Sequence, residues 1–381
     1  FFLFPLLLLG EITAYPRRRK MWLIRSGLKE GHSYLEEGIG LGTSPILASR
    51  IVGAKGRIYA LDNHPLQIIL LSLRSKIRRI KNIKLILSDA SKTARIIRID
   101  ILIFISGSLI IHILLQIKEI KKIADSLKIS FFIIGALARD IIMEYFYEIK
   151  APRMTMDIDL GIKISRWKQF DKLINTLEKS GEFKKLKEKR RVLYNDILID
   201  IVPFGDISDK NERISWPPEN EVVMSVMGFN EVYNYSTLVR LQNNPTLEVK
   251  IPTLPGLAIL KLFAWKDNFP NRSKDAEDLL FIMKNYENAG IFDKLYKSEL
   301  QLLESEDFDN QVAGIVLLGK EMSKICTNQT IEYLRKIIDE ETSKNSDFNL
   351  IRDMLLPKRD DFNRILYLLK KLKEGIYYQR K

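Results

Sequence analysis

Three aspartates lie in apolar stretches of the sequence. A buried carboxylate is unfavourable unless a partner compensates its charge. Asp157 and Asp159 alternate with Met156, Ile158 and Leu160, and the two-residue repeat of a strand would put both carboxylates on one face. Adjacent carboxylates repel each other, and burying them beside apolar side chains is unfavourable unless a cation neutralises them. Oxygen ligands of this kind suit Mg²⁺ in phosphoryl-transfer sites. A solvated acidic pair on an edge strand is the alternative.

A third carboxylate, Asp200, interrupts the aliphatic run from Ile197 to Pro203. A lone carboxylate in a buried strand needs a partner. If this strand runs beside the strand of Asp157, Asp200 completes a three-carboxylate cluster that would bind two metal ions and activate an attacking hydroxyl. All three histidines of the chain precede residue 113. In the part of the chain that holds the three aspartates, these carboxylates must therefore serve as the general acid and base.

A glycine turn lies upstream of the aspartates. A buried strand turns through Gly135 into a helix that begins at Ala136. Free backbone N–H groups and the positive helix end meet at such a turn and would bind phosphate, although a connection without any ligand has the same pattern. Arg139, on that helix, is expected either to contact phosphate or to pair with Asp140 or Asp157.

In order and spacing, these motifs resemble the DNA polymerase beta-like nucleotidyltransferase superfamily. The stretch looks most similar to the AbiEii/AbiGii toxin-type nucleotidyltransferases. The likeness covers roughly residues 115 to 375 and continues through Trp216-Pro217-Pro218 and through the segment from Leu257 to Asp267. The resemblance implies a toxin-like nucleotidyltransferase that moves a nucleoside monophosphate from an NTP to a hydroxyl or phosphate acceptor. It also implies RNA or tRNA as the acceptor and an antitoxin protein as partner.

The resemblance assigns roles to particular residues. It implies that Asp157 and Asp159 bind both Mg²⁺ ions, that Asp200 holds the catalytic ion and helps deprotonate the acceptor, and that Gly135 cradles the triphosphate. Ala136 departs from the pattern, because the superfamily usually has a glycine or serine there. A hydroxyl contact to the phosphate is therefore lost, while the backbone donors survive.

Downstream residues carry weaker expectations. The resemblance implies that Lys261 holds the triphosphate, against the alternative of a surface lysine that snorkels to solvent. Asp275 and Asp278 are expected to cap the helix that they open. The basic run from Lys184 to Arg191 is either a track for an RNA backbone or a solvated hairpin.

A glycine-rich loop in the N-terminal part follows a strand and precedes a helix, between Leu35 and Gly42. With Asp62 and Asp89 at the ends of the next two strands, it resembles the S-adenosylmethionine-binding half of class I methyltransferases. The resemblance implies residual cofactor binding, with the loop around the cofactor, Asp62 at the ribose and Asp89 at the adenine. The residues concerned are Glu36, Gly38, Gly40, Gly42, Asp62 and Asp89. Too few strands precede residue 113 for a complete methyltransferase, so methyl transfer is not expected.

Hydrophobic periodicity predicts the elements that must position these residues. Strands at 33–37, 57–61, 84–88 and 100–105, with helices at 45–52 and 66–80, predict a parallel sheet. The amphipathic stretch at 113–128 leads into a small mixed α/β unit, and the chain after Pro255 reads as helical. The expected fold is α/β: a partial Rossmann-like parallel sheet (1–112), a polymerase-beta-like nucleotidyltransferase core (113–254) and a helical C-terminal region (255–381).

Composition sets wider bounds. The 381 residues suffice for two domains, and the net charge of +13 favours polyanionic partners, although it also fits an ordinary lysine-rich protein. Cys326 is the single cysteine, which excludes an intrachain disulfide and a cysteine-based zinc site and favours a reducing cytoplasm. The apolar run at 1–9 is too short to span a bilayer, so no membrane partner is expected. A methyltransferase with an accessory domain and a non-catalytic module with vestigial sites are the alternative functions.

Overall fold

The computed structural model of the chain describes residues 23, 28–37, 39, 42–62, 64–87, 101–104, 108–147, 149–151, 153, 155, 157–194, 197–242, 246–355 and 361–378. The chain forms two compact units. The N-terminal unit comprises Phe1–Lys121 with Leu241–Leu247, and the C-terminal unit comprises Lys122–Arg240 with Glu248–Lys381. Within the described residues, no helix combines the length and the apolarity that a bilayer crossing requires.

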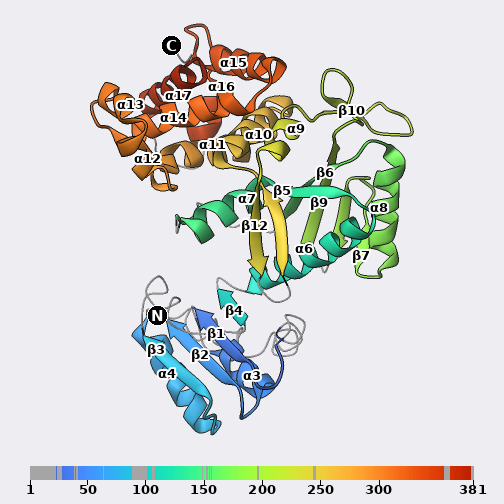
Figure 1. The fold of residues 1–381 in the computed structure, drawn as a ribbon, viewed down its shortest axis with the longest axis vertical. Helices are drawn as coiled ribbons and strands as arrows, with labels where there is room; N and C mark the ends of the chain where they lie inside the picture. Colours follow the sequence, from blue (N-terminus) through green and yellow to red (C-terminus); the bar gives the residue numbers. More distant parts are fainter. Residues whose placement is uncertain are drawn as a thin grey trace. The chain divides into compact units, whose positions relative to one another are not determined.

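The N-terminal unit holds a four-stranded sheet in the order β3-β2-β1-β4 (Figure 1). Every neighbouring pair of these strands is parallel, which confirms the predicted parallel sheet. Two helices connect the first three strands, and Ile46 and Leu71 from these helices pack with Ala60 in the core. The elements are β1 (Ser33–Glu37), α3 (Thr43–Val52), β2 (Arg57–Asp62), α4 (Pro65–Ile77), β3 (Ile83–Leu87) and β4 (Ile101–Phe104).

The C-terminal unit is built on a seven-stranded mixed sheet in the order β12-β13-β5-β6-β9-β8-β7. At its centre β5 is antiparallel to β6, and β6 is parallel to β9. The strands are β5 (Ser130–Ile134), β6 (Ile158–Lys163), β7 (Phe183–Lys185), β8 (Arg191–Tyr194), β9 (Ile197–Phe204), β12 (Thr237–Gln242) and β13 (Leu247–Ile251). A separate antiparallel ribbon joins β10 (Arg213–Ser215) to β11 (Val223–Ser225).

Helices precede and flank this sheet. The predicted helix at 136–146 divides into an α-helical turn and a π-helical turn. The helix bounds are α6 (Ser108–Ser126), α7 (Gly135–Asp140), η1 (Ile141–Phe146), α8 (Trp167–Lys179) and α9 (Phe229–Asn234). Helix α8 packs beside β7 and buries Phe170, Leu173 and Leu177 on one face (Figure 1). Such an amphipathic helix covers the sheet with its apolar face and leaves its charged face in water.

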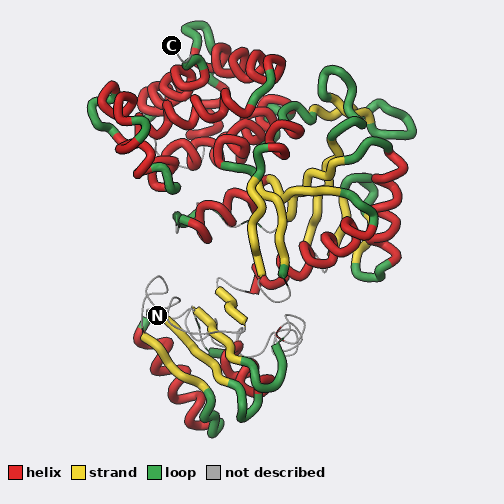
Figure 2. Tube along the Cα trace, viewed as in Figure 1, coloured by secondary structure: helices red, strands yellow, loops and turns green. Residues whose placement is uncertain are grey.

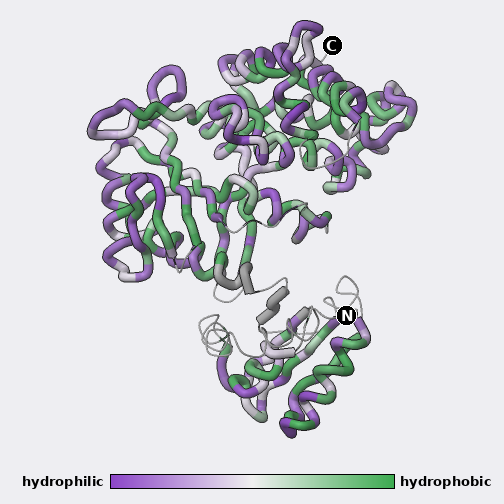
Figure 3. The backbone as a smooth tube through the Cα atoms, turned by 180° about the vertical axis from the view of Figure 1, so that it is seen from behind, coloured by the Kyte–Doolittle hydropathy of each residue, from purple (hydrophilic) through white to green (hydrophobic). Residues whose placement is uncertain are grey.

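After β13 the regular elements of the described residues are all helices, as predicted (Figure 2). The elements are α10 (Leu254–Asp267), α11 (Ser273–Asn285), η2 (Tyr286–Asn288), α12 (Phe292–Lys297), α13 (Leu300–Ser305), α14 (Asn310–Ile325), α15 (Asn328–Thr342), α16 (Asn349–Leu355) and α17 (Phe362–Ile376). Hydrophilic and hydrophobic residues alternate along these helices (Figure 3). Helix α10 differs, because it is buried on most of its circumference and even one of its two lysines, Lys261, lies in the interior.

Helices α14 and α17 cross at unusually short range because glycines stand at the contact. A Cβ on Gly375 would lie 2.0 Å from the carbonyl oxygen of Val316, and one on Gly319 would lie 2.3 Å from that of Leu372. Only residues without a side chain permit this approach. The crossing holds the last helix of the chain against the centre of the helical region.

Candidate active site

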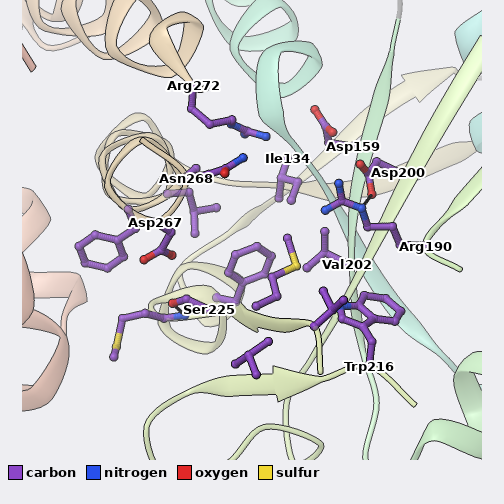
Figure 4. Close-up of a pocket in the computed structure, with 18 of the residues that line it drawn as sticks. Ile134, Asp159, Arg190, Asp200, Val202, Trp216, Ser225, Asp267, Asn268 and Arg272 are labelled. Carbon is purple, nitrogen blue, oxygen red and sulfur yellow. Dashed lines mark hydrogen bonds and ion pairs between the residues drawn. The ribbon is translucent and has the colours of Figure 1, made fainter. Parts of the chain in front are cut away.

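Two of the predicted catalytic carboxylates lie directly opposite each other on neighbouring strands. β6 and β9 run parallel, and their register pairs Asp159 with Asp200. The residues before and after each aspartate are fully buried, whereas the two carboxyl groups are half-buried. This is the alternation of a strand with one apolar face. Figure 4 shows both side chains directed toward the same space.

Burial raises the pKa of Asp159 to about 6, against the opposing field of Lys261 and with a further contribution from the Asp200 carboxylate. Burial also raises the pKa of Asp200, and the nearby Arg190 and Arg191 guanidinium groups oppose that rise. The pair is therefore costly to hold fully ionised. A cation bound between the two carboxylates would relieve both their desolvation and their mutual repulsion.

The positive charges nearest to Asp200 come from the basic run that follows β7. Arg190 Nε lies 3.3 Å from Asp200 Oδ1, and Arg191 Nε lies 3.4 Å from Oδ2. β7 and β8 form an antiparallel hairpin beside β9. The basic run therefore lies in a hairpin, which was one of its two expected forms. Oδ1 of Asp200 is buried and accepts no hydrogen bond from any residue in the described ranges.

The glycine turn lies immediately over Asp159. Gly135 has a positive φ of 69°, and a Cβ at this position would lie 2.0 Å from Asp159 Oδ2. Every L-residue is therefore disfavoured here both by the backbone conformation and by contact with the carboxylate. Ala136, the next residue, is buried. The turn thus brings main-chain groups to the carboxylate pair with no side chain in between.

The carboxylates open into a cavity of about 720 Å³. Gly135, Asp159, Asp200, Arg190 and Arg272 contribute to its wall. In Figure 4, Arg272 reaches toward Asp159, while Trp216 and Ser225 lie on the opposite side. The apolar part of the wall includes Trp216, Met224, Met227, Phe229, Leu257 and Phe263. A cavity with a few convergent charges and a large apolar wall suits a ligand with an anionic part and a flat, weakly polar part.

A network of buried charges centred on Lys261 forms part of this wall. Its Nζ lies 2.7 Å from Asp275 Oδ1 and 2.6 Å from Asp278 Oδ2, so it is not the snorkelling surface lysine of the alternative. Burial lowers the pKa of Lys261, but the Asp275 and Asp278 carboxylates outweigh burial and raise it overall. The expected capping role of these aspartates is corrected as well, because α11 has no side-chain cap and both carboxylates bind Lys261 instead.

The comparison with family models decides the class of this unit. A model described as "Nucleotidyl transferase AbiEii toxin, Type IV TA system" matches residues 126–367. The chain belongs to the AbiEii family. The match spans the glycine turn, both opposed carboxylates, the cavity and the buried lysine network, and it confirms the resemblance stated from the motifs. No curated protein matches the chain.

Asp157 stands apart from the other two aspartates in this AbiEii domain. It is exposed and precedes the first residue of β6, Ile158. The strand alternation that was expected to place Asp157 beside Asp159 therefore does not extend to it. Among the described residues, no group of three or more histidine, cysteine or acidic side chains is arranged to hold a metal ion. The predicted three-carboxylate cluster is present here as a pair, and Asp157 as its third member stays a prediction.

Arg139 corrects another expectation. Its side chain is completely buried, Nε donates a hydrogen bond of 2.7 Å to Asp140 Oδ1, and the guanidinium also pairs with Asp278. Burial raises the pKa of Asp140 to about 6, and Arg139 opposes that rise. Arg153 Nη2 adds a second cation 2.8 Å from Asp278 Oδ1. Arg139 thus ties α7 to α11, and its hydrogen bonds go to Asp140, Asp278 and the carbonyl oxygen of Arg153. Of the expected alternatives, the structure shows the pairing with Asp140.

Arg272 was missed by the sequence reading. It lies just before α11, its guanidinium pairs with Asp275, and its side chain is 46% exposed in the cavity wall. Burial lowers the pKa of Arg272, but the Asp275, Asp159 and Asp200 carboxylates outweigh it and raise that pKa. The available signal was the three-residue spacing from Arg272 to Asp275, which allows an ion pair at a helix start. Nothing in the sequence placed this pair beside β6.

The N-terminal candidates are only partly within the described residues. Glu36 is buried and accepts a hydrogen bond of 3.0 Å from the Tyr34 hydroxyl. Asp62, at the end of β2, is buried and accepts a hydrogen bond of 2.8 Å from the His64 N–H. Gly42, with φ of 74°, precedes α3. The remaining candidates, Gly38, Gly40 and Asp89, lie outside the described residues.

Solved structures similar to the N-terminal part are methyltransferases. One is a SAM dependent methyltransferase from Aquifex aeolicus, with 26% identity over 23% of this chain and 47% of its own, and a TM-score of 0.22. Another is a SAM-dependent O-methyltransferase from Thermotoga maritima, with 20% identity over 24% of this chain and 35% of its own, and a TM-score of 0.23. The chain spans less than half the length of either protein.

Proposed function

We propose that the AbiEii domain is a Mg²⁺-dependent nucleotidyltransferase that transfers a nucleoside monophosphate from an NTP to a hydroxyl or phosphate acceptor. One observation carries the proposal. Asp159 and Asp200 face each other on adjacent strands, directly under the main chain of Gly135, at the wall of a cavity of about 720 Å³. Paired carboxylates beside a phosphate-sized turn are the arrangement that phosphoryl and nucleotidyl transfer require.

The carboxylate pair fits a divalent cation. Its donors are the hard oxygens that Mg²⁺ prefers, burial raises both pKa values, and Asp200 Oδ1 lacks a hydrogen bond from the described residues. Asp159 and Asp200 would hold the ion, and Asp157 is proposed as a further ligand of the expected two-metal site. When bound, Mg²⁺ would neutralise the carboxylates and the phosphate oxygens of the NTP.

The chain's own residues account for binding and proton transfer. The Gly135 turn and Arg272 would hold the triphosphate, while Lys261 keeps Asp275 and Asp278, and hence Arg272, in position. The apolar wall would hold the nucleoside. Asp200 would accept the proton of the acceptor hydroxyl while the acceptor oxygen bonds to the α-phosphorus. The bond from that phosphorus to the bridging oxygen then breaks, and pyrophosphate leaves with the electron pair.

The identities of the acceptor and of the protein partner are also proposals. The net charge of +13 supports an acceptor with a polyanionic backbone, such as RNA or tRNA. The family description, a type IV toxin-antitoxin system, supports an antitoxin protein as partner. We assign the nucleotidyltransferase core to residues 113–254 and its helical region to 255–381. S-adenosylmethionine binding by the segment 1–112 stays a prediction.

The test is transfer of label from each of the four α-labelled NTPs into total tRNA with Mg²⁺. The unmodified chain should label RNA, and Asp159→Asn and Asp200→Asn should each abolish labelling. Asp171→Asn, which removes one exposed carboxylate from α8, is the matched control and should label normally. Labelling that survives both site substitutions would refute the assignment. Labelling of the protein itself in place of RNA would identify the protein as the acceptor and would leave the proposed reaction class unchanged.

A further inference from the structure

Arg190 is a charged residue of the cavity wall to which the transfer reaction described above assigns no role. It precedes β8, and its carbonyl oxygen accepts a hydrogen bond of 2.8 Å from Ile201 N–H on β9. The main chain is thereby fixed to the catalytic strand, so only the side chain is free to change partner. That side chain is 31% exposed and reaches Asp200 Oδ1 at 3.3 Å.

We propose that Arg190 is a resident counter-cation of Asp200 that a divalent metal ion displaces, and that the displaced guanidinium then binds a phosphate group of the substrate. The inference rests on the proposed function. It makes Arg190 a positioning residue in the free enzyme and a phosphate ligand in the loaded one. The physical basis is competition, because an arginine and a divalent cation both need the same carboxylate oxygen and repel each other.

The neighbouring Arg191 shows why the exchange is assigned to Arg190. Arg191 also contacts Asp200, but it has a second carboxylate partner, Glu188, at 3.3 Å. Asp200 is the one acidic partner that Arg190 has among the described residues. Arg190 also lines the cavity, and Arg191 does not belong to its wall. Once Asp200 turns to a metal ion, Arg190 is therefore the cation left without a counter-charge, at the place where an anionic substrate enters.

Loss of the Arg190 charge should change the affinity for the metal ion and the affinity for the NTP in opposite directions. Removal of the Arg190 charge frees Asp200 for a metal ion and removes a repulsive neighbour, so metal binding should tighten. The same removal takes one cation away from the phosphate, so NTP binding should weaken. A residue that served only to stabilise the hairpin would not shift the two affinities in opposite directions.

The experiment measures Mn²⁺ binding to the full chain without nucleotide, from the electron paramagnetic resonance signal of the free ion. Arg190→Gln should bind Mn²⁺ about three- to tenfold more tightly than the unmodified chain, the range of one partly exposed ion pair. Lys184→Gln removes one exposed positive charge from β7 in the same hairpin and should leave Mn²⁺ affinity unchanged. With Mn²⁺ saturating, Arg190→Gln should bind a non-hydrolysable NTP analogue about tenfold more weakly.

Each outcome decides something. Mn²⁺ affinity in Arg190→Gln that equals or falls below that of the unmodified chain overturns the inference and leaves the proposed function standing. If Asp200→Asn binds Mn²⁺ as well as the unmodified chain does, the metal site itself is wrong and both proposals fail. Arg190→Met is a second neutral variant, with folding checked by circular dichroism. If both neutral variants are unfolded, Arg190 is a structural counter-ion and the inference is overturned.

Discussion

Gly135→Ala is the substitution that tests the geometry of the site most directly. A Cβ at this position would lie 2.0 Å from Asp159 Oδ2, and ordinary contacts begin near 3.4 Å. The carboxylate oxygen would have to retreat by the difference, about 1.4 Å, or the turn would have to move by as much. Since misplacement of a catalytic group by about 1 Å can cost about 100-fold in rate, transfer should fall by at least that factor.

A second glycine separates this effect from backbone strain. Gly181 has a φ of 79°, close to the 69° of Gly135, but a Cβ there would meet nothing within 4 Å. Both alanine variants should therefore lose about 1 kcal/mol of unfolding free energy from the left-handed conformation, and Gly135→Ala should lose more because its methyl group also meets Asp159. Only Gly135→Ala should lose transfer activity, because only there does the new methyl group meet a carboxylate.

The assay pairs urea unfolding with label transfer and with Mn²⁺ affinity for the same two proteins. Both variants should be folded in the absence of urea, with the larger loss of unfolding free energy in Gly135→Ala, and their activities should differ by about two orders of magnitude. Activity in Gly135→Ala within threefold of the unmodified chain would show that Asp159 can move without loss, and the carboxylate would then have no catalytic task. Equal loss of activity in both variants would trace the effect to folding.

Three further results are expected. Because the pKa of Asp159 is raised to about 6, its contribution to unfolding free energy should decrease as pH rises from about 4 to about 6, and Asp159→Asn should remove that slope in pH-dependent urea titrations. Lys261→Met should lower the unfolding free energy by about 3 to 5 kcal/mol, since it removes the buried cation that Asp275 and Asp278 share, whereas Lys266→Met, at a more exposed pair, should cost under about 1 kcal/mol; equal costs would contradict the network. Gly375→Ala should lower the melting temperature by several degrees, because its methyl group meets the Val316 carbonyl at 2.0 Å; an unchanged melting temperature would exclude the close crossing of α14 and α17.

Much of the fold follows from local sequence pattern. Short, partly apolar runs gave the strands of the N-terminal sheet within one or two residues, most plainly in β3 and β4, where Ile and Leu dominate as in buried parallel strands. β12 and β13 were not predicted, and β7, β10 and β11, with three residues each, also escaped detection. Strands of three residues are too short to show a period, and their pairing is decided by the partner strand.

Local sequence pattern likewise predicted only part of the candidate site. Asp159 and Asp200 were predictable, because a carboxylate in an apolar strand is conspicuous and needs a partner. Asp157 precedes the first residue of β6, and strand ends are the least predictable feature of a pattern, so its place beside the pair stays a prediction. Arg139 was misread for a different reason: its partner Asp278 follows it by 139 residues, and only the tertiary fold brings the two together.

The buried charges explain why the helical region belongs to the site. Arg139 follows the glycine turn on α7, and its second partner, Asp278, lies on α11. Asp278 also binds Lys261 of α10, which in turn holds Asp275, the partner of Arg272 in the cavity wall. A sheet alone would leave Arg139 as a buried, half-paired cation, which is strongly destabilising. The glycine turn and Arg272 are therefore fixed by one continuous set of ion pairs, so the surroundings of the carboxylate pair depend on α10 and α11 as well as on the sheet.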